Sequence, residues 1–302
     1  MSVEDERLHA DGTEHWARWV LGARFEAEAT QGWEPVPFHQ QVRQAVLSWA
    51  SPQAGEVVLD VGAGDGLIGF GALAPVGNSG RVIFTDVAPE LVEYCRRTAA
   101  ARGCEDRCEF LVAGAEDLSA IPDSSVDVVT TRSVLIFVAA KDQALREFHR
   151  VLRPGGRLAM FEPINSFGQP EVETRFWGFD LSSIPEIARK LHDAHERYRL
   201  GPCASMTDFD ERDILAGLER AGYAQHVMQL TTQVVSTPLL DSADWDTFLA
   251  TAPNPLVPTF DVFLDEVLNA DERQALEGHL RPLVEAKQGT RRQATAYFWA
   301  RA

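Results

Sequence analysis

Three glycines and two carboxylates are grouped in the stretch VVLDVGAGDGLIGF. Gly62, Gly64 and Gly66 are spaced as G-x-G-x-G, and Asp60 and Asp65 lie beside them. Glycines at the end of a strand let a ligand approach the backbone closely. The dinucleotide fingerprint is G-x-G-x-x-G, however, and a pyrophosphate would be repelled by two carboxylates at short range. The stretch therefore favours a ligand that carries positive charge.

S-adenosylmethionine is a ligand of this charge, because its sulfonium and its α-ammonium are both cationic while its adenosine still needs a close backbone turn. Asp86 ends the next β-rich run along the chain. A carboxylate at the end of the second strand can accept two hydrogen bonds from ribose hydroxyls. The sequence therefore predicts S-adenosyl-L-methionine as the cofactor, which leaves as S-adenosyl-L-homocysteine.

The charge of the chain argues against several partners. The 302 residues have a formal charge of −17 and a pI of about 4.9. A field of this sign repels nucleic acid and anionic lipid. The acidic start MSVEDERLHADG is unlike a signal peptide, and no apolar run approaches the roughly 18 residues of a membrane span. We therefore expect a cytoplasmic monomer or homodimer that binds neither nucleic acid nor a membrane.

Potential metal ligands do not form a complete pattern. Cys104 and Cys108 are spaced as C-x3-C, but no second pair and no histidine pair follows to complete a zinc site. His192 and His195 are three residues apart on an expected helix, without a carboxylate–histidine signature. We therefore expect no metal site and four free thiols.

The elements that must position these residues alternate from residue 56 onward. Short β-rich runs are separated by segments with apolar residues near i, i+3 and i+4 and a Gly or Pro stop. Such alternation predicts an α/β protein whose parallel sheet has helices on both faces. The expected strands are 56–62, 81–87, 108–114, 126–133, 156–164 and 225–236, followed by the chain end RRQATAYFWARA.

Helical segments surround this core. Apolar spacing predicts a helix at 14–29, and residues 1–50 are expected to form an N-terminal helical cap on a core of residues 51–302. An insertion at about 165–206 is too short for a core of its own and is expected to act as a mobile lid. Its aromatic run RFWGFD has no strand pattern. A second, helical insertion is expected at about 242–288.

Five segments in order resemble the motifs of class I S-adenosylmethionine-dependent methyltransferases, in the broad small-molecule group. The resemblance covers about residues 56–235 and the final strand. It implies a Rossmann-like, seven-stranded, mostly parallel sheet in the order 3-2-1-4-5-7-6, with strand seven antiparallel, an N-terminal helical extension and helical lid insertions. The segments are VVLDVGAGDG (57–66), VIFTD (82–86), AGAEDL (113–118), SSVDVVTTRSVL (124–135) and LREFHRVLRPGGRLAMFEP (145–163).

The resemblance also implies a cofactor site. In this site Gly62, Gly64 and Gly66 would lie along the cofactor, and Asp60 and Asp65 would face its amino-acid end. Arg132 and Ser133 would lie under the methionine moiety, and Ala115 and Glu116 at the adenine. Gly114 stands where many relatives have Asp, so a contact to the adenine amino group must come from Glu116 or from backbone. The full implied set is Asp60, Gly62, Gly64, Asp65, Gly66, Asp86, Val87, Ala115, Glu116, Arg132 and Ser133.

The acceptor pocket is expected at the N-terminal helices and the insertion after the fifth strand, where aromatic residues are concentrated. This composition favours a small, largely apolar acceptor for O-, N- or C-methylation, in specialised metabolism such as natural product biosynthesis. Arg132 and Arg175 favour instead a carboxylate- or pyrophosphate-bearing metabolite, and a modified peptide is a further alternative. The candidate substrate residues are Trp33, His39, Phe167, Arg175, Trp177 and Tyr198.

Methyl transfer depends mainly on alignment in a dry pocket, with a base where the nucleophile needs one. Glu162 follows LAMF at the end of the fifth strand and is the first candidate base, and His195 is the second. Carboxylate O-methylation needs no base, and capping or a salt bridge would give Glu162 a structural role. A different class stays open, because a chain of this fold can bind S-adenosylmethionine as a cyclase or as a non-catalytic partner protein.

Overall fold

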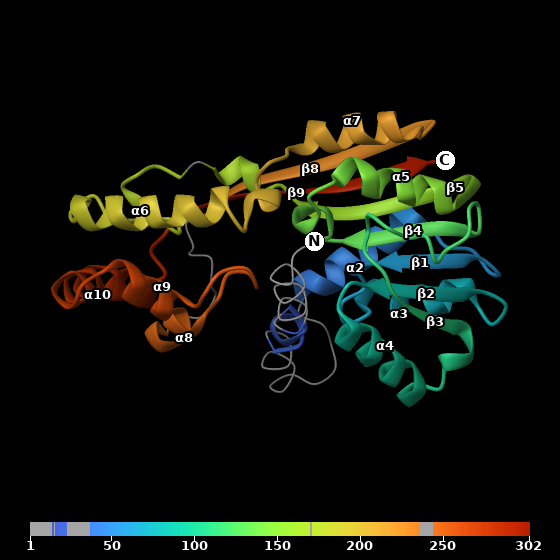
Figure 1. Cartoon of the computed structure of the whole chain (residues 1–302), viewed down its shortest axis with the longest axis horizontal. Coiled ribbons are helices and arrows are strands. Elements are labelled where there is room, and N and C mark those ends of the chain that lie inside the picture. Colours follow the sequence, from blue (N-terminus) through green and yellow to red (C-terminus); the bar gives the residue numbers. More distant parts are fainter. Residues whose placement is uncertain (1–13, 15, 23–36, 170, 236–243) are drawn as a thin grey trace, which may run out of the picture. The chain divides into compact units, whose positions relative to one another are not determined.

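The largest sheet has seven strands in the order β3-β2-β1-β4-β5-β9-β8, which confirms the order and the α/β class predicted from the motifs (Figure 1). The computed structural model describes residues 14, 16–22, 37–169, 171–235 and 244–302. The strands of this sheet are β1 (Val57–Val61), β2 (Arg81–Asp86), β3 (Cys108–Val112), β4 (Val126–Arg132), β5 (Leu152–Pro163), β8 (Gln225–Val235) and β9 (Arg291–Arg301).

The first five strands are parallel, and β9 runs against them. β1 pairs with β2 and β4, β2 with β3, and β4 with β5. β9 is antiparallel to β5, since Gly156 pairs with Ala302 at one end while the N–H of Ile164 donates to Ala294 at the other. β5 begins at Leu152, earlier than expected, because its first residues pair with β4 across a bulge. Cofactors bind at the carboxyl ends of such parallel strands.

Helices pack on the sheet and on one another. α3 contacts β1, β2 and β4, α4 contacts β2 and β3, and α5 contacts α7. Asn269 and Glu272 form a capping box at the start of α10, with Thr259 capping α9 and Asp244 capping α8. None of the described helices is long and apolar enough to cross a membrane. The helices are α2 (Pro37–Ala50), α3 (Leu67–Val76), α4 (Pro89–Ala101), α5 (Lys141–Val151), α6 (Pro185–Leu200), α7 (Glu211–Ala221), α8 (Trp245–Ala250), α9 (Phe260–Val267) and α10 (Ala270–Glu285).

The chain divides into two compact units. Unit 1 consists of the described residues up to 162 with 211–229 and 296–302, and unit 2 consists of those in 163–210 and 230–295. Buried side chains of both expected insertions pack in one apolar cluster, so neither insertion has to form a core alone. The lid function expected of the first insertion stays a prediction. Members of the cluster include Phe179, Leu191, Phe248, Leu264 and Leu280.

The aromatic run RFWGFD, for which no strand was expected, forms a hairpin of two short strands. β6 (Arg175–Phe176) pairs antiparallel with β7 (Phe179–Asp180) around Trp177 and Gly178. The expectation was wrong because the turn places a tryptophan at a φ of +50°, a conformation that its sequence does not indicate. A Cβ on Gly178 would lie 2.4 Å from the carbonyl oxygen of Thr290, so only glycine fits there.

The N-terminal helix is present where the chain is described. Residues 14 and 16–22 are helical, and the rest of the helix expected at 14–29 lies outside the described residues. The ring of Trp16 meets Phe137 edge-on, with centroids 4.3 Å apart, so this segment packs within unit 1. The function of residues 1–50 as a cap stays a prediction.

We expect Arg157→Ala to lower the free energy of unfolding by about 2–3 kcal/mol, because Arg157 makes several charge-assisted hydrogen bonds at a half-buried position. Its guanidinium donates to the carboxylate of Glu56 and to the carbonyls of Ala50 and Ser51, which joins β5 to the end of α2 and the start of β1. Urea unfolding would measure the change. Arg81→Ala, which breaks an exposed ion pair in the same unit, is the control and should cost less. Equal losses would contradict the prediction.

Candidate active site

Asp60 in β1 is a buried structural link. It is 2% exposed, its Oδ1 accepts the hydroxyl of Thr130 on β4 at 2.9 Å, and its Oδ2 accepts the N–H of Gly69 in α3 at 2.8 Å. Burial raises the pKa of Asp60 to about 7, and the charge of Arg132 opposes that rise. Asp60 therefore joins two strands to the helix that follows the glycine loop. Its contact with the cofactor stays a prediction.

The glycine loop after β1 has left-handed backbone at all three glycines. The φ angles of Gly62, Gly64 and Gly66 are +63°, +58° and +80°. A Cβ on Gly62 would lie 2.4 Å from Cγ2 of Val134. The nearest atom to a Cβ on Gly64 would be Cγ1 of Val20 at 3.7 Å, so backbone conformation is the constraint there. The loop therefore needs glycine for its conformation and for close packing.

Asp86 ends β2 and binds the glycine loop directly. Its carboxylate is buried, with Oδ2 accepting the N–H of Gly64 at 2.9 Å and Oδ1 accepting the N–H of Ala88 at 3.0 Å. Burial raises the pKa of Asp86, and these N–H bonds act against the rise. A carboxylate has about four acceptor sites, so capacity remains for ribose hydroxyls. The loop and this carboxylate therefore fit S-adenosylmethionine.

The residues implied at the adenine follow β2 and β3. Val87 is 52% exposed and lies beside Gly114, since a Cβ on Gly114 would be 3.3 Å from Cγ1 of Val87. Ala115 is buried. Glu116 accepts the N–H of Ala140 through Oε1 at 3.0 Å, at the start of α5. A contact between Glu116 and the adenine therefore stays a prediction.

Arg132 at the end of β4 lies in the field of two buried carboxylates. Asp60 and Glu162 both raise its pKa through charge, whereas burial, the larger effect, lowers it. Ser133 follows with a φ of +56°, which is uncommon for a residue other than glycine. Asp65 accepts the first N–H of α3 at 3.3 Å. The strand ends thus bring the cofactor candidates of unit 1 to one edge of the sheet.

Glu162 is fully buried and caps a 3₁₀ turn. Oε1 accepts the N–H groups of Val134 at 3.0 Å and Leu135 at 3.1 Å, and Oε2 accepts that of Ile136 at 3.4 Å. Burial raises the pKa of Glu162 to about 7, although the three N–H bonds oppose the rise. Capping is therefore a role that Glu162 has in this structure. Its role as a base stays a prediction.

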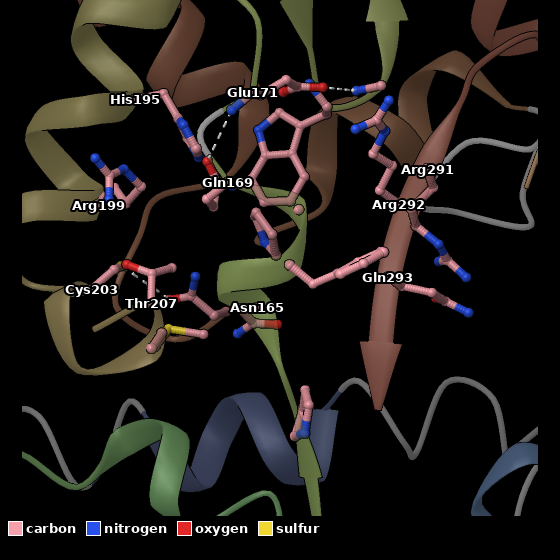
Figure 2. A pocket seen from close by; sticks show the side chains of 18 of the residues that line it. Asn165, Gln169, Glu171, His195, Arg199, Cys203, Thr207, Arg291, Arg292 and Gln293 are labelled. Carbon is pink, nitrogen blue, oxygen red and sulfur yellow. Dashed lines mark hydrogen bonds between the residues drawn. The ribbon is translucent and has the colours of Figure 1, made fainter. Parts of the chain in front are cut away.

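Unit 2 contains a cavity of about 600 Å³ (Figure 2). Figure 2 shows His195 and Arg199 reaching into it from α6, and Arg291, Arg292 and Gln293 coming from β9 on the opposite side. Aromatic rings and polar groups alternate in its walls, which suits a small ligand with an apolar body and a polar end. Further lining residues include Asn165, Gln169, Glu171, Asn254, Phe260 and Phe263.

The cavity gathers most of the acceptor residues proposed from the sequence. His39 lies on α2 in unit 1 and does not line the cavity, and Trp33 lies outside the described residues. Glu162 also belongs to unit 1. The proposed residues that do line the cavity are Phe167, Arg175, Trp177, His195 and Tyr198.

His195 has the features of a proton acceptor. Its ring packs edge-on against Trp177 with centroids 5.4 Å apart. Burial lowers its pKa, the charge of Glu196 opposes the fall, and the charge of Arg199 adds to it. A neutral imidazole at neutral pH can accept a proton. Within the described residues, no group of three His, Cys, Asp or Glu side chains could hold a metal ion.

Sequence reasoning missed several cavity residues. Arg291 and Arg292 stand in the last strand, more than 80 residues from α6, and Asn254 lies in the second insertion. No local pattern marks them. Only a last strand was expected in the segment that contains these arginines.

The fold and the glycine-loop site define a class I S-adenosylmethionine-dependent methyltransferase. The sequence profile of the ubiE/COQ5 methyltransferase family matches residues 36–238. The chain belongs to this family, and it is an enzyme that uses S-adenosylmethionine and a small-molecule methyl acceptor.

The chain is also similar to individual proteins that are described as methyltransferases. The chain is 32% identical over 187 residues to a "Ubiquinone/menaquinone biosynthesis C-methyltransferase" of Hahella chejuensis, over 61% of this chain and 73% of that protein. A protein of the same description from Enterobacter sp. is 30% identical over 66% of this chain and 78% of its own length. Among solved structures, the YcgJ protein of Bacillus subtilis matches with a TM-score of 0.54 and 19% identity, over 87% of this chain and 98% of that one. That likeness confirms the fold.

We expect Asp86→Ala to weaken binding of S-adenosylhomocysteine by about 1.5–3 kcal/mol, because a buried charged acceptor is lost. Calorimetry of the purified chain would measure this, with circular dichroism to confirm folding. Asp106→Ala, at an exposed carboxylate of the same unit, is the control. An unchanged dissociation constant for Asp86→Ala would show that Asp86 only holds the loop.

The raised pKa of Glu162 predicts a pH effect on stability. Its pKa is about 7 in the folded chain against an ordinary 4.5, so the folded state binds the proton more tightly. The free energy of unfolding therefore receives a contribution that is complete below pH 4.5 and is lost as the pH rises through 7. Glu162→Gln should make the decline between these values shallower in urea titrations. Glu277→Gln, on the exposed side of α10, controls for amide substitution, and an unchanged slope for Glu162→Gln would contradict the prediction.

Proposed function

We propose that unit 1 binds S-adenosylmethionine and that the cavity of unit 2 binds a small methyl acceptor with an apolar body. When bound, the cofactor supplies a methyl group on a sulfonium. The observation that supports this assignment is the cavity of about 600 Å³, whose aromatic walls carry a few polar groups. Cofactor and acceptor binding then belong to separate units of the chain.

Methylation at carbon is the reaction that the relatives favour, since their names describe C-methyltransferases. Transfer to an aromatic or alkene carbon needs a base, because the carbon nucleophile forms when an acidic proton leaves or the product loses one. O- or N-methylation of a phenol or an amine stays within the same proposal. Identifying the acceptor would also identify the pathway, whether it belongs to specialised metabolism or not.

We assign proton removal to His195. It lines the cavity, and burial keeps its imidazole neutral, which is the form that accepts a proton. Trp177 orients the ring through its edge-on contact. Glu162, whose oxygens hold the backbone N–H groups of residues 134–136, shapes the turn after Arg132.

The test of the function is the appearance of S-adenosylhomocysteine and a heavier product when the chain is incubated with methyl-labelled S-adenosylmethionine and metabolite extract. Mass spectrometry would identify the product. Binding of the cofactor with no transfer to any fraction would instead indicate a cyclase or a non-catalytic partner protein.

Once an acceptor is known, His195→Asn should reduce kcat by about 100-fold, the usual scale of a general base, and leave cofactor affinity unchanged. His192→Asn is the matched control, because His192 lies on the same helix and does not line the cavity. Glu162→Gln separates the two candidate bases. If Glu162→Gln lowers kcat to a similar extent and leaves the KM for the cofactor unchanged, Glu162 is the base. A raised KM for the cofactor would instead agree with a capping role for Glu162.

A further inference from the structure

The cavity of unit 2 carries charge of the opposite sign to the chain. The whole sequence has 28 Lys and Arg against 45 Asp and Glu. The cavity is lined by four arginines and a single carboxylate side chain, which are Arg175, Arg199, Arg291, Arg292 and Glu171. An acidic protein that collects guanidinium groups around one cavity concentrates attraction for an anion there.

Protein partners account for only part of this charge. Arg199 is paired with Glu196, whose Oε1 accepts its Nε–H at 2.7 Å. In the part of the chain that the structure describes, no carboxylate forms an ion pair with Arg292. Arg175 forms no close ion pair there either, but it interacts at longer range with Glu171 and with Asp180, its partner across the β6–β7 hairpin. Among the described lining side chains, guanidinium groups therefore outnumber carboxylates, and Arg292 is the one whose charge no described carboxylate pairs.

Glu171 is occupied with backbone. Its Oε2 accepts the N–H of Trp177 at 3.0 Å and its Oε1 accepts that of Gly178 at 2.6 Å. Burial raises the pKa of Glu171, and its two N–H bonds and the charge of Arg175 oppose the rise. The one acidic group in the cavity therefore serves to hold a turn.

That turn positions an aromatic surface. Trp177 has a φ of +50°, a conformation that persists only when the surroundings impose it, and such residues are concentrated at ligand sites. The N–H of Thr290 donates to the carbonyl of Gly178 at 2.9 Å and fixes the turn from the side of β9. The indole packs edge-on against Phe260, with centroids 5.5 Å apart. A flat ring is therefore held in the cavity wall by a strained backbone.

We propose that the methyl acceptor is a planar acid whose ring lies against Trp177 and whose carboxylate or phosphate is bound by Arg175, Arg291 and Arg292. Guanidinium groups bind such oxyanions in bidentate fashion, and aromatic rings pack in offset or edge-on geometry. Arg291 and Arg292 lie beyond residues 36–238, the part of the chain that matches the family. The inference rests on the proposed function, because it names the acceptor of the same cavity.

The test is a binding measurement that does not require turnover. The full chain, saturated with S-adenosylhomocysteine, is titrated by calorimetry with 2-naphthoate, 2-naphthyl phosphate and the neutral isostere 2-naphthamide. We expect at least one acid to bind about tenfold or more tightly than the amide, in keeping with a charge-assisted hydrogen bond. The two acids distinguish a carboxylate site from a phosphate site. Raising the salt concentration should weaken the acids and leave the amide unchanged.

Variants locate the site. Arg292→Gln should remove most of the preference for the acid, and it can be expected to fold because Arg292 is exposed. Arg281→Gln, on an exposed face of α10 in the same unit, is the matched control and should keep the preference. Trp177→Phe should weaken acid and amide alike. Equal binding of acid and amide, binding of none of the three, or an unchanged preference in Arg292→Gln would each overturn the inference. S-adenosylhomocysteine formation from a neutral acceptor alone would overturn it while leaving the proposed function intact.

Discussion

The candidate cofactor site depends on charged groups that are buried at the carboxyl ends of three neighbouring strands. Asp60 in β1 and Glu162 in β5 are both almost inaccessible, and Arg132 in β4 interacts with each through charge. Isolated, each would be costly to bury. Thr130, Gly69 and residues 134–136 satisfy the carboxylates, and the result fixes the turns after β1 and β4. The glycine loop can then present its backbone to a ligand, with Asp86 holding Gly64.

Unit 2 also contains a carboxylate that holds a backbone turn. Glu171 is half-buried, and its two oxygens accept hydrogen bonds from two successive N–H groups. These bonds hold Trp177 in a left-handed conformation. In both units, a carboxylate accepts hydrogen bonds from backbone N–H groups and thereby fixes a turn. The difference lies in the surroundings, because unit 1 surrounds its carboxylates with strand ends, whereas unit 2 surrounds its carboxylate with arginines and aromatic rings. The first environment suits a cationic cofactor and the second an amphipathic acceptor.

The family match covers most of unit 1 and part of unit 2. The matched residues 36–238 include the glycine loop and every described cofactor candidate. The segment from α8 to β9 follows the match, and it supplies Asn254, Phe260 and Arg292 to the cavity. The cofactor candidates therefore lie within the family match, whereas part of the cavity lining lies outside it.

The sequence by itself determined the class of fold and the cofactor. A G-x-G-x-G turn between acids, followed at strand spacing by Asp86, specifies local backbone and charge, and these are properties of short segments. The strand order was implied by the resemblance of these motifs to class I methyltransferases, and the sheet confirms it. Only the tertiary structure decided that Glu162 caps the turn of residues 134–136, that RFWGFD forms a hairpin, and that Arg175 shares a cavity with Arg292. The physical reason is distance along the chain, because burial, capping partners and cavity walls arise from segments that meet only after folding, and no local pattern encodes which segments will meet.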